Sequence, residues 1–374
     1  MNCLLRPLWV LSFVAIFALC TGNVLAQQYI FTNNNVANST NSTTALTLSG
    51  KGVLKVLKTY STGGKSTGSR AYFALSPVTS ARTRLGTCLF VSNGGDSTIA
   101  AFQMNLFDGG LTSVHGSPFS DGVNGAQPQG VGLAAGGSLL FAGNANNNSI
   151  SVLRIGPSCS LKVLKKVTVH GSPAGMKVTP DGAFVIAAYI GQVDSFKINA
   201  STGDLTELGP FNPKGSAAGV DISCDGTMVY FGDAASNTQV EVFSIGSSGD
   251  LKEVNNFTDK NGQSSNNVIL SVDGKHLYVS NTMSNQITTL SVGSNGALTY
   301  DNTVKLKKPG LYALGMTTGT SGLDLLVSEQ NNPESIGVLA AVGDTLREVI
   351  GSPFHVIKNG PDPAGLTAVP KGCN

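Results

Sequence analysis

The chain has 374 residues, a formal net charge of +2 and only 12% charged residues, about half the usual share. Because its basic residues form no cluster, the composition excludes the electrostatic footprint of a nucleic-acid-binding protein. After the N-terminal segment, no stretch is long and apolar enough to span a bilayer, so we expect no membrane span.

The first 26 residues have the pattern of a secretory signal peptide. A basic start precedes the apolar run 8–19, and residues 24–26 offer a small-residue cleavage site. Cys20 leaves lipidation of the N-terminus open as an alternative. We therefore expect an exported protein, periplasmic, secreted or at the cell surface, whose mature chain is residues 27–374.

A ten-residue pattern, roughly P-x-G-V-x-L-S-P-D-G, recurs along the mature chain and is its strongest signal. Its clearest copies are PAGMKVTPDG, AAGVDISCDG and SNNVILSVDG. Most copies begin 44 to 52 residues after the previous one. In chain order, the seven copies lie at 70–79, 128–137, 173–182, 217–226, 265–274, 311–320 and 363–372.

Each copy is followed by the same succession of segments. A β-branched or aromatic run such as 276–281 leads through an Asn- and Ser-rich loop to an alternating run such as 239–245, and a Gly-x-Leu turn leads to a fourth run. Short alternating runs bounded by turn residues are typical of strands, and Asp-Gly turns suit hairpins. Four strands in each of seven periods predict one all-β domain, a seven-bladed β-propeller.

The two ends of the mature chain predict how the ring closes. The N-terminus begins with a strand of the second type, at 29–32, and the seventh strand of the first type lies at 363–370. If these two strands pair, the C-terminal strand completes a blade with the three N-terminal strands. Closure of this kind removes the exposed sheet edges.

Four cysteines remain after signal removal, and an exported protein permits disulfides between them. Ring closure places Cys373 and Cys88 on one face, which suggests a Cys88–Cys373 bridge. Cys159 and Cys224 belong to different blades and show no obvious pairing. None of the four has CxxC spacing, so we expect no zinc site. Asn clusters at 33–35 and 146–148 could ligate calcium, but few carboxylates accompany them, so we expect no metal and no cofactor.

The succession of an SPDG-type turn, LYVSN, an alternating strand and G-x-L resembles the lactonase-type seven-bladed propeller family, with its 6-phosphogluconolactonase-like and YVTN-repeat proteins. The resemblance covers the mature chain and implies a hydrolase that opens a small sugar-type lactone. It also implies Arg and His at the second and third positions of the first-strand pattern, which line the channel mouth. Neither residue type occurs there in this chain, where the fourteen positions hold Ala71, Tyr72, Gln129, Gly130, Ala174, Gly175, Ala218, Gly219, Asn266, Asn267, Tyr312, Ala313, Ala364 and Gly365.

Strand direction predicts which side chains can meet. If each first strand runs from an upper to a lower face, the upper face carries the loops between second and third strands and the connections between blades. These segments hold the candidate catalytic residues Glu329, His170 and His355, and the candidate binding residues His115, Asp96 and Asp233. Glu329 is the candidate general base, with His170 or His355 as proton donor.

The stretch VHGSPFSDG at 114–122 suggests a Ser-His-Asp triad, but Gly-Ser-Pro occurs three times, which favours a turn. Two functions stay open. The first is an exported lactone hydrolase, and the alternative is a non-catalytic propeller that binds a protein, a glycan or another surface ligand. In either case we expect a monomer.

Overall fold

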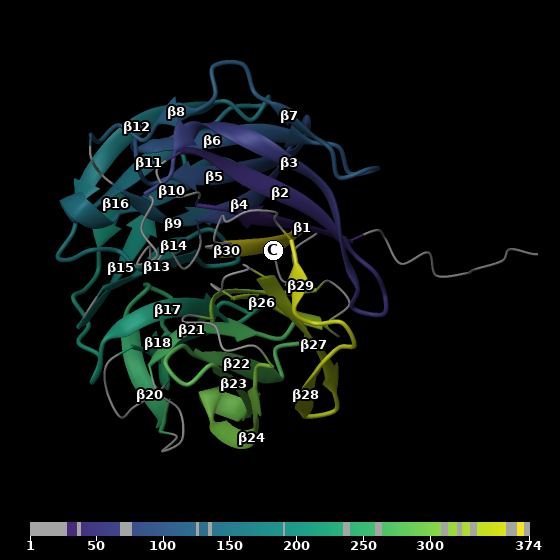
Figure 1. Cartoon of the computed structure of the whole chain (residues 1–374). Coiled ribbons are helices and arrows are strands. Elements are labelled where there is room, and N and C mark those ends of the chain that lie inside the picture. Colours follow the sequence, from purple (N-terminus) through teal and green to yellow (C-terminus); the bar gives the residue numbers. More distant parts are fainter. Residues whose placement is uncertain are drawn as a thin grey trace, which may run out of the picture.

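The structure is a computed structural model in which seven antiparallel sheets, each with four strands in its main path, form a ring. It describes residues 28–35, 39–67, 77–124, 127–133, 137–189, 191–234, 240–258, 264–307, 313–319, 324–329, 335–356 and 365–369. The signal-peptide prediction and Cys20 lie outside these residues. In Figure 1 the inner strands gather near the middle and the outer strands β12, β16, β20 and β24 lie at the periphery. The seven-bladed propeller is confirmed.

The blades are numbered in chain order, and each is given from its inner to its outer strand. Blade 1 is β30 (Gly365–Val369), β1 (Gln28–Asn33), β2 (Thr40–Leu48) and β3 (Leu54–Lys65). Blade 2 is β4 (Val78–Thr83), β5 (Gly86–Asn93), β6 (Thr98–Met104) and β7 (Leu111–Ser113), with the short β8 (Phe119–Ser120) also on β6. Blade 3 is β9 (Pro128–Leu133), β10 (Leu139–Asn144), β11 (Ser149–Ile155) and β12 (Leu161–Thr168).

The remaining four blades follow the same order. Blade 4 is β13 (Gly175–Val178), β14 (Phe184–Tyr189), β15 (Gln192–Ile198) and β16 (Leu205–Glu207). Blade 5 is β17 (Ala217–Ile222), β18 (Met228–Asp233), β19 (Val240–Ile245) and β20 (Leu251–Phe257). Blade 6 is β21 (Ser265–Leu270), β22 (His276–Asn281), β23 (Gln286–Val292) and β24 (Leu298–Lys305). Blade 7 is β25 (Ala313–Thr318), β26 (Asp324–Glu329), β27 (Ser335–Val342) and β28 (Thr345–Glu348), with β29 (Phe354–His355) also on β27.

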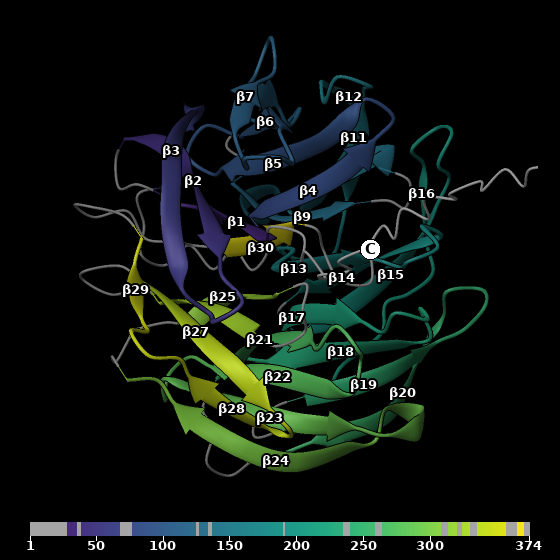
Figure 2. The same cartoon turned by 90° about the vertical axis from the view of Figure 1, so that its right-hand side faces the viewer.

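Both termini contribute to blade 1, as predicted. The C-terminal strand β30 pairs with β1 in an antiparallel register in which Tyr29 lies opposite Val369, and the two strands lie side by side in both views (Figures 1 and 2). The inner strands contact one another around the ring, from β30 through β4, β9, β13, β17, β21 and β25 back to β30. Closure leaves no open edge along this inner ring.

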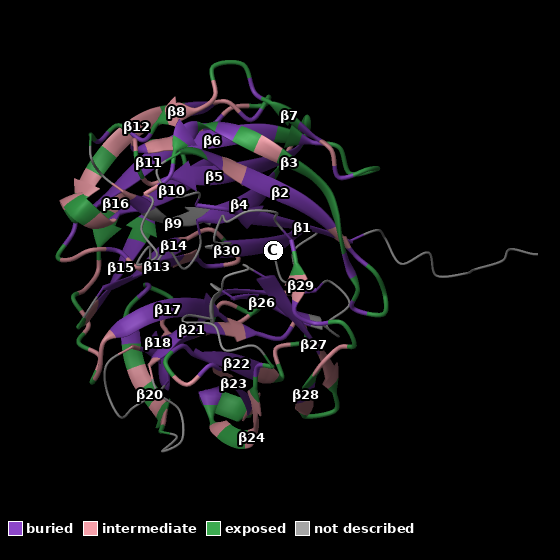
Figure 3. Ribbon diagram, in the orientation of Figure 1, coloured by how far each residue is buried: buried purple, intermediate pink, exposed green. Residues whose placement is uncertain are grey.

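The hydrophobic core lies between the faces of neighbouring blades. Seven clusters of buried apolar side chains occupy the seven blade interfaces, one at each. The inner three strands of each blade are therefore largely buried, whereas exposed residues gather on outer strands such as β12, β20 and β24 (Figure 3). In the described part of the chain, no helix is long and apolar enough to cross a membrane.

One first strand lies later in the chain than the repeat pattern predicts. The pattern places it within 70–79, but β4 spans Val78–Thr83 and residues 70–76 lie outside the described residues. Pro77 precedes the strand instead of forming the turn after it, and its carbonyl accepts a hydrogen bond from Ser92 N at 2.9 Å. A proline fits this place because it has no N–H to contribute to the ladder. The channel positions of the copy that begins at Pro77 are Val78 and Thr79, so Arg and His remain absent there.

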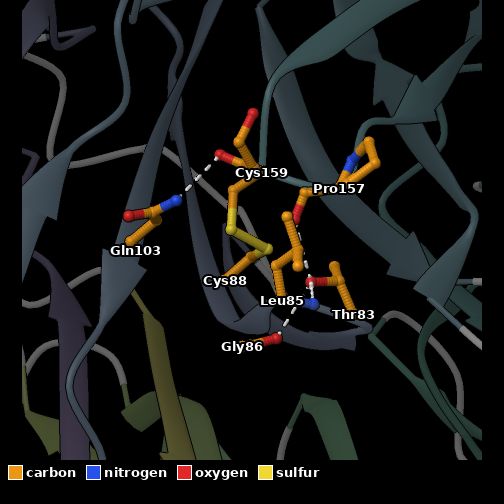
Figure 4. Close-up of a disulfide and its surroundings, with 8 residues drawn as sticks. Thr83, Leu85, Gly86, Cys88, Gln103, Pro157 and Cys159 are labelled. Atoms are coloured by element: carbon orange, nitrogen blue, oxygen red, sulfur yellow. Dashed lines mark hydrogen bonds between the residues drawn. A yellow bond between two sulfur atoms is a disulfide. The ribbon is translucent and has the colours of Figure 1, made fainter.

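The predicted Cys88–Cys373 bridge is wrong, because Cys88 is bonded to Cys159 with a Cα–Cα distance of 5.5 Å. Cys159 lies in the turn after β11 of blade 3, which reaches across to the start of β5 in blade 2 (Figure 4). The Thr83 hydroxyl holds the same turn by donating to the Pro157 carbonyl at 3.2 Å. Cys224 is disulfide-bonded as well, and Cys373 lies outside the described residues.

Candidate functional site

In each of the seven blades, the second strand ends at the upper face in a buried side chain. In blades 3 and 6 this residue is an asparagine whose amide donates to a hydroxyl of the third strand, as from Asn281 to Thr288 at 2.8 Å. Two candidates from the sequence, Glu329 and Asp233, occupy the same position of the repeat. The seven equivalent residues are Asn33, Asn93, Asn144, Tyr189, Asp233, Asn281 and Glu329.

Glu329 and His355 both belong to blade 7. Glu329 is fully buried and accepts a hydrogen bond from the Ser335 hydroxyl at 3.4 Å. Its carboxylate lies over Gly337, where a Cβ would come within 2.5 Å of Glu329 Oε1. His355 is exposed and pairs with Ser335 from the other side, through β29. Ser335 thus lies between the two candidates in the sheet.

The three candidate binding residues are not brought together. Asp96 accepts hydrogen bonds from the backbone N–H of Lys65 at 2.8 Å and from Thr98 Oγ1 at 2.7 Å, which ties blade 1 to blade 2. Asp233 accepts from Ser216 N at 2.8 Å in blade 5. His115 is exposed in the turn after β7.

The Gly-Ser-Pro motifs of blades 2 and 7 are structural. The Ser117 hydroxyl accepts a hydrogen bond from Ala101 N at 2.9 Å, and the Ser352 hydroxyl accepts one from Val338 N at 3.0 Å. Both serines precede a cis proline. In both blades the serine lies in the connection that leaves the outer strand, and its hydrogen bond holds that connection against the third strand. These contacts agree with the prediction that Ser117 is a turn residue.

His170 meets two carboxylates on the upper side of blade 4. Its Nδ1 lies 3.2 Å from Asp194 Oδ2 and 3.3 Å from Glu207 Oε1. His170 belongs to the connection from β12 to β13, Asp194 is the third residue of β15, and Glu207 ends the outer strand β16. The Asp194 side chain has no exposure, whereas 48% of the His170 side chain is exposed. A partly exposed imidazole therefore pairs with a fully buried carboxylate.

Two further side chains complete the surroundings of Asp194. The Gln192 amide donates to Asp194 Oδ1 at 2.9 Å, so each carboxylate oxygen has a partner. The Tyr189 hydroxyl is buried and has no hydrogen-bond partner among the described residues. Burial raises the pKa of Tyr189, and the charge of Asp194, the interaction of the hydroxyl with that carboxylate and the charge of Glu207 raise it further.

The electrostatics of the cluster favour a proton on the imidazole. The hydrogen bond to Asp194 raises the pKa of His170, burial opposes this, and the charges of Asp194 and Glu207 add to the increase. With His170, Asp194 and Glu207 each offering one ligand atom, all within 4.8 Å of one another, the group also has a composition that can hold a metal ion.

Asp194 and Glu207 were not predicted from the sequence, because each resembles an ordinary residue of an alternating strand. Alignment of the third strands supplies the missing signal. Asp194 pairs with the residue two before the end of its second strand, and in most other blades the equivalent residue is small or neutral. The seven residues at this position are Ala45, Ala100, Ser151, Asp194, Glu241, Thr288 and Gly337.

The central channel presents a different arrangement. Lys177 on β13 forms an ion pair with Asp221 on the neighbouring inner strand β17, with Nζ and Oδ1 2.9 Å apart. The other Asp221 oxygen accepts from Leu270 N on β21 at 2.8 Å. These contacts join three inner strands, so both charges have partners within the wall of the ring.

Comparison with known proteins agrees with this architecture. Residues 48–220 match the family described as "Lactonase, 7-bladed beta-propeller". The "putative 6-phosphogluconolactonase" of Bacteroides fragilis is 19% identical, with a TM-score of 0.73 over 92% of this chain and 98% of that one. The periplasmic gluconolactonase PpgL of Pseudomonas aeruginosa is also 19% identical, with a TM-score of 0.71 over 91% and 98%. No curated protein matches the chain. The predicted resemblance to lactonase-type seven-bladed propellers is therefore confirmed, and the solved structures show the shared fold.

Proposed function

We propose that this lactonase-type propeller hydrolyses a lactone and that His170 is its general base. The observation that carries the proposal is the pair of His170 with the buried Asp194, at 3.2 Å. A carboxylate that accepts a hydrogen bond from Nδ1 orients the ring, leaves Nε2 as the proton acceptor, and stabilises the imidazolium that forms. The non-catalytic alternative predicts no such pair at the channel mouth. This pair lies instead at the end of the outer strands, so the proposal is supported by its geometry and not by the position that the sequence predicted.

The chemistry requires only water and the lactone. The imidazole takes a proton from water, whose oxygen attacks the carbonyl carbon and forms a bond to it. The ring C–O bond then breaks, and the imidazolium returns its proton to the departing oxygen. The product is the open hydroxy acid, with every atom of lactone and water retained.

The distribution of arginine supports a substrate without phosphate. Recognition of a phosphosugar favours arginine forks near the reacting group. Arg82 and Arg84 lie at the hairpin between β4 and β5, and Arg347 lies in β28 near its first turn. Arg154 donates to the carbonyl of Ala200 at 3.0 Å, in the turn before β16. These four lie toward the lower face, opposite His170, and Arg70 lies outside the described residues.

We also propose that the chain is exported and cleaved before Gln27. The apolar segment 8–19 with its cleavage site supports this. The Cys88–Cys159 disulfide is consistent with an oxidising compartment. Sequencing the N-terminus of the protein recovered from its host tests the proposal. A chain that retains residues 1–26 contradicts it.

A lactone panel tests the hydrolase assignment. The mature chain is incubated with EDTA and with sugar and acyl lactones, and acid release is measured against the spontaneous rate. We expect turnover of at least one lactone, and a loss of about 100- to 10,000-fold in His170→Gln. His115→Gln, which changes another exposed histidine, is the matched control. Absence of turnover throughout the panel, or full activity in His170→Gln, overturns the proposal.

A further inference from the structure

We infer that His170, Asp194 and Glu207 bind a divalent transition-metal ion at the upper end of blade 4. The inference depends on the geometry of the cluster and not on lactone hydrolysis. Within the part of the chain that the structure describes, this is the one group of three or more His, Cys, Asp or Glu residues whose ligand atoms converge.

The distances are close to those of a coordination sphere. Ligands about 2.0–2.2 Å from a tetrahedral Zn²⁺ lie roughly 3.4 Å from one another. His170 Nδ1 already lies 3.2 Å from Asp194 Oδ2 and 3.3 Å from Glu207 Oε1. Only the two carboxylates, within 4.8 Å, must come closer. Glu207 ends an outer strand and is 36% exposed, so its side chain can make this movement.

The ligand types indicate which ions fit. Two carboxylates and a neutral imidazole carry a charge of −2, which a divalent cation neutralises. An imidazole suits Zn²⁺ and other late first-row ions, whereas Ca²⁺ and Mg²⁺ prefer oxygen ligands alone. Three protein ligands leave a coordination position for water or a ligand.

Tyr189 provides an independent reason to expect a ligand here. Tyr189 is 1% exposed, and its hydroxyl lies close enough to Asp194 and Glu207 to interact with both carboxylates, yet no contact of the hydroxyl has normal hydrogen-bond geometry among the described residues. Groups around a metal site commonly hydrogen-bond its carboxylate ligands or its bound water. A bound ion with its water therefore supplies the partner that this buried hydroxyl lacks.

Metal binding also has a consequence for the imidazole. A neutral imidazole has one lone pair on its ring nitrogens. If the metal takes the lone pair of Nδ1, the proton resides on Nε2, which then cannot accept another. Where the proposed hydrolysis holds, the metal-bound form is inactive, and Zn²⁺ inhibits over the concentration range in which it binds.

Calorimetric titration of the EDTA-treated, dialysed mature chain with ZnCl₂ tests the inference. We expect one saturable Zn²⁺ per chain and a loss of affinity of at least about tenfold in each of His170→Ala, Asp194→Asn and Glu207→Gln. His115→Ala is the matched control and retains the affinity of the native chain. Circular dichroism melting identifies any variant that does not fold, and Glu207→Gln, at the partly exposed strand end, keeps the test decisive if Asp194→Asn unfolds.

Three outcomes are separable. No saturable Zn²⁺ binding, or binding that persists unchanged in His170→Ala and Glu207→Gln, overturns the metal site. Turnover in EDTA that depends on His170, without Zn²⁺ binding, overturns the metal site and supports the hydrolase. Zn²⁺ binding that requires all three ligands, without turnover of any lactone, supports the metal site and overturns the hydrolase.

Discussion

Blades 4 and 5 each bury a carboxylate at the same position of the third strand, and they differ in what reaches it. In blade 5, the incoming connection brings two backbone donors to Glu241: Gly215 N to Oε1 and Lys214 N to Oε2, both at 2.9 Å. In blade 4, the incoming connection brings the side chain of His170 to Asp194. Glu241 thus accepts hydrogen bonds from the backbone, whereas Asp194 pairs with a titratable imidazole that faces solvent.

The comparison teaches that burial of an acid does not by itself indicate function. Burial raises the pKa of Glu241, and the charges of Glu253 and Asp233 add to this, while the two backbone N–H groups oppose it. Such a carboxylate satisfies donors that are otherwise unpaired, which is a structural task. Asp194 satisfies only side chains, so its loss leaves the backbone of blade 4 intact.

The largest expected difference is in stability. Glu241→Ala removes the acceptor of two backbone N–H groups and lowers the free energy of unfolding by about 3 kcal/mol. Asp194→Ala costs about 1 kcal/mol, because Gln192 and His170 can turn to water. Urea unfolding of the two variants measures the difference. If both variants lose the same free energy of unfolding, the structural role of Glu241 does not differ from that of Asp194.

A buried carboxylate in blade 2 extends the comparison to pH. Asp121 follows β8 and accepts from Val123 N at 2.8 Å; burial raises its pKa from 3.8 to about 7, and the charge of Asp96 adds to this. Because the folded pKa exceeds the unfolded one, the contribution of Asp121 to stability is complete below about pH 4 and is lost as the pH rises through 7. The free energy of unfolding of Asp121→Asn therefore rises relative to that of the native chain as the pH increases from 4 to 8. A difference that stays constant with pH contradicts this assignment.

The incoming connections of blades 4 and 5 also differ in how much space they leave for a side chain at their glycines. A Cβ on Gly215 would lie 1.5 Å from Asp233 Oδ2, whose side chain is buried and bonded to Ser216 N. A Cβ on Gly171 would lie 3.0 Å from Tyr189 Cβ. We expect Gly215→Ala to cost about 2 kcal/mol and Gly171→Ala less than about 1 kcal/mol, by thermal melting. The reverse order means that the connection of blade 4 is the more tightly held.

The smallest effects are expected in blades 2 and 7, where Ala100 and Gly337 stand at the position of the acid and a serine hydroxyl of the outgoing connection accepts from the third strand. Ser117→Ala and Ser352→Ala each remove one acceptor of a backbone N–H and cost about 1 kcal/mol. Lactone turnover is unaffected in both. Loss of turnover in Ser117→Ala with the fold intact restores the serine to a catalytic role.

The fold was predictable because the sequence pattern of one blade recurs seven times along the chain. Each copy repeats a turn, a β-branched run and an alternating run, and errors in one copy are corrected by the others. The prediction failed at 70–79, where a Ser-Pro pair resembles the repeat's turn, and β4 begins at Val78. It failed again for Cys88, because the turn that carries Cys159 reaches across a blade interface, and no repeat encodes that reach.

The candidate site was predictable only in part. His170 was a candidate because strand direction places it on the upper face. Asp194 was missed because the third strands are buried on both faces, so a buried acid on β15 does not disturb the alternation of side chains in the sequence. Glu329 was singled out as an unusual residue, but it occupies the repeat position that asparagine fills in other blades.

The most direct test compares Asp194→Asn with Glu241→Gln, by lactone turnover and urea unfolding of the same preparations. The account predicts that Asp194→Asn loses about 100-fold or more in turnover with a change in unfolding free energy below about 1 kcal/mol, because the ring loses the carboxylate that orients it. Glu241→Gln retains turnover while folded and loses about 2 kcal/mol of stability. If Asp194→Asn keeps its turnover, or if both variants lose stability equally and turnover falls only with unfolding, the account is contradicted.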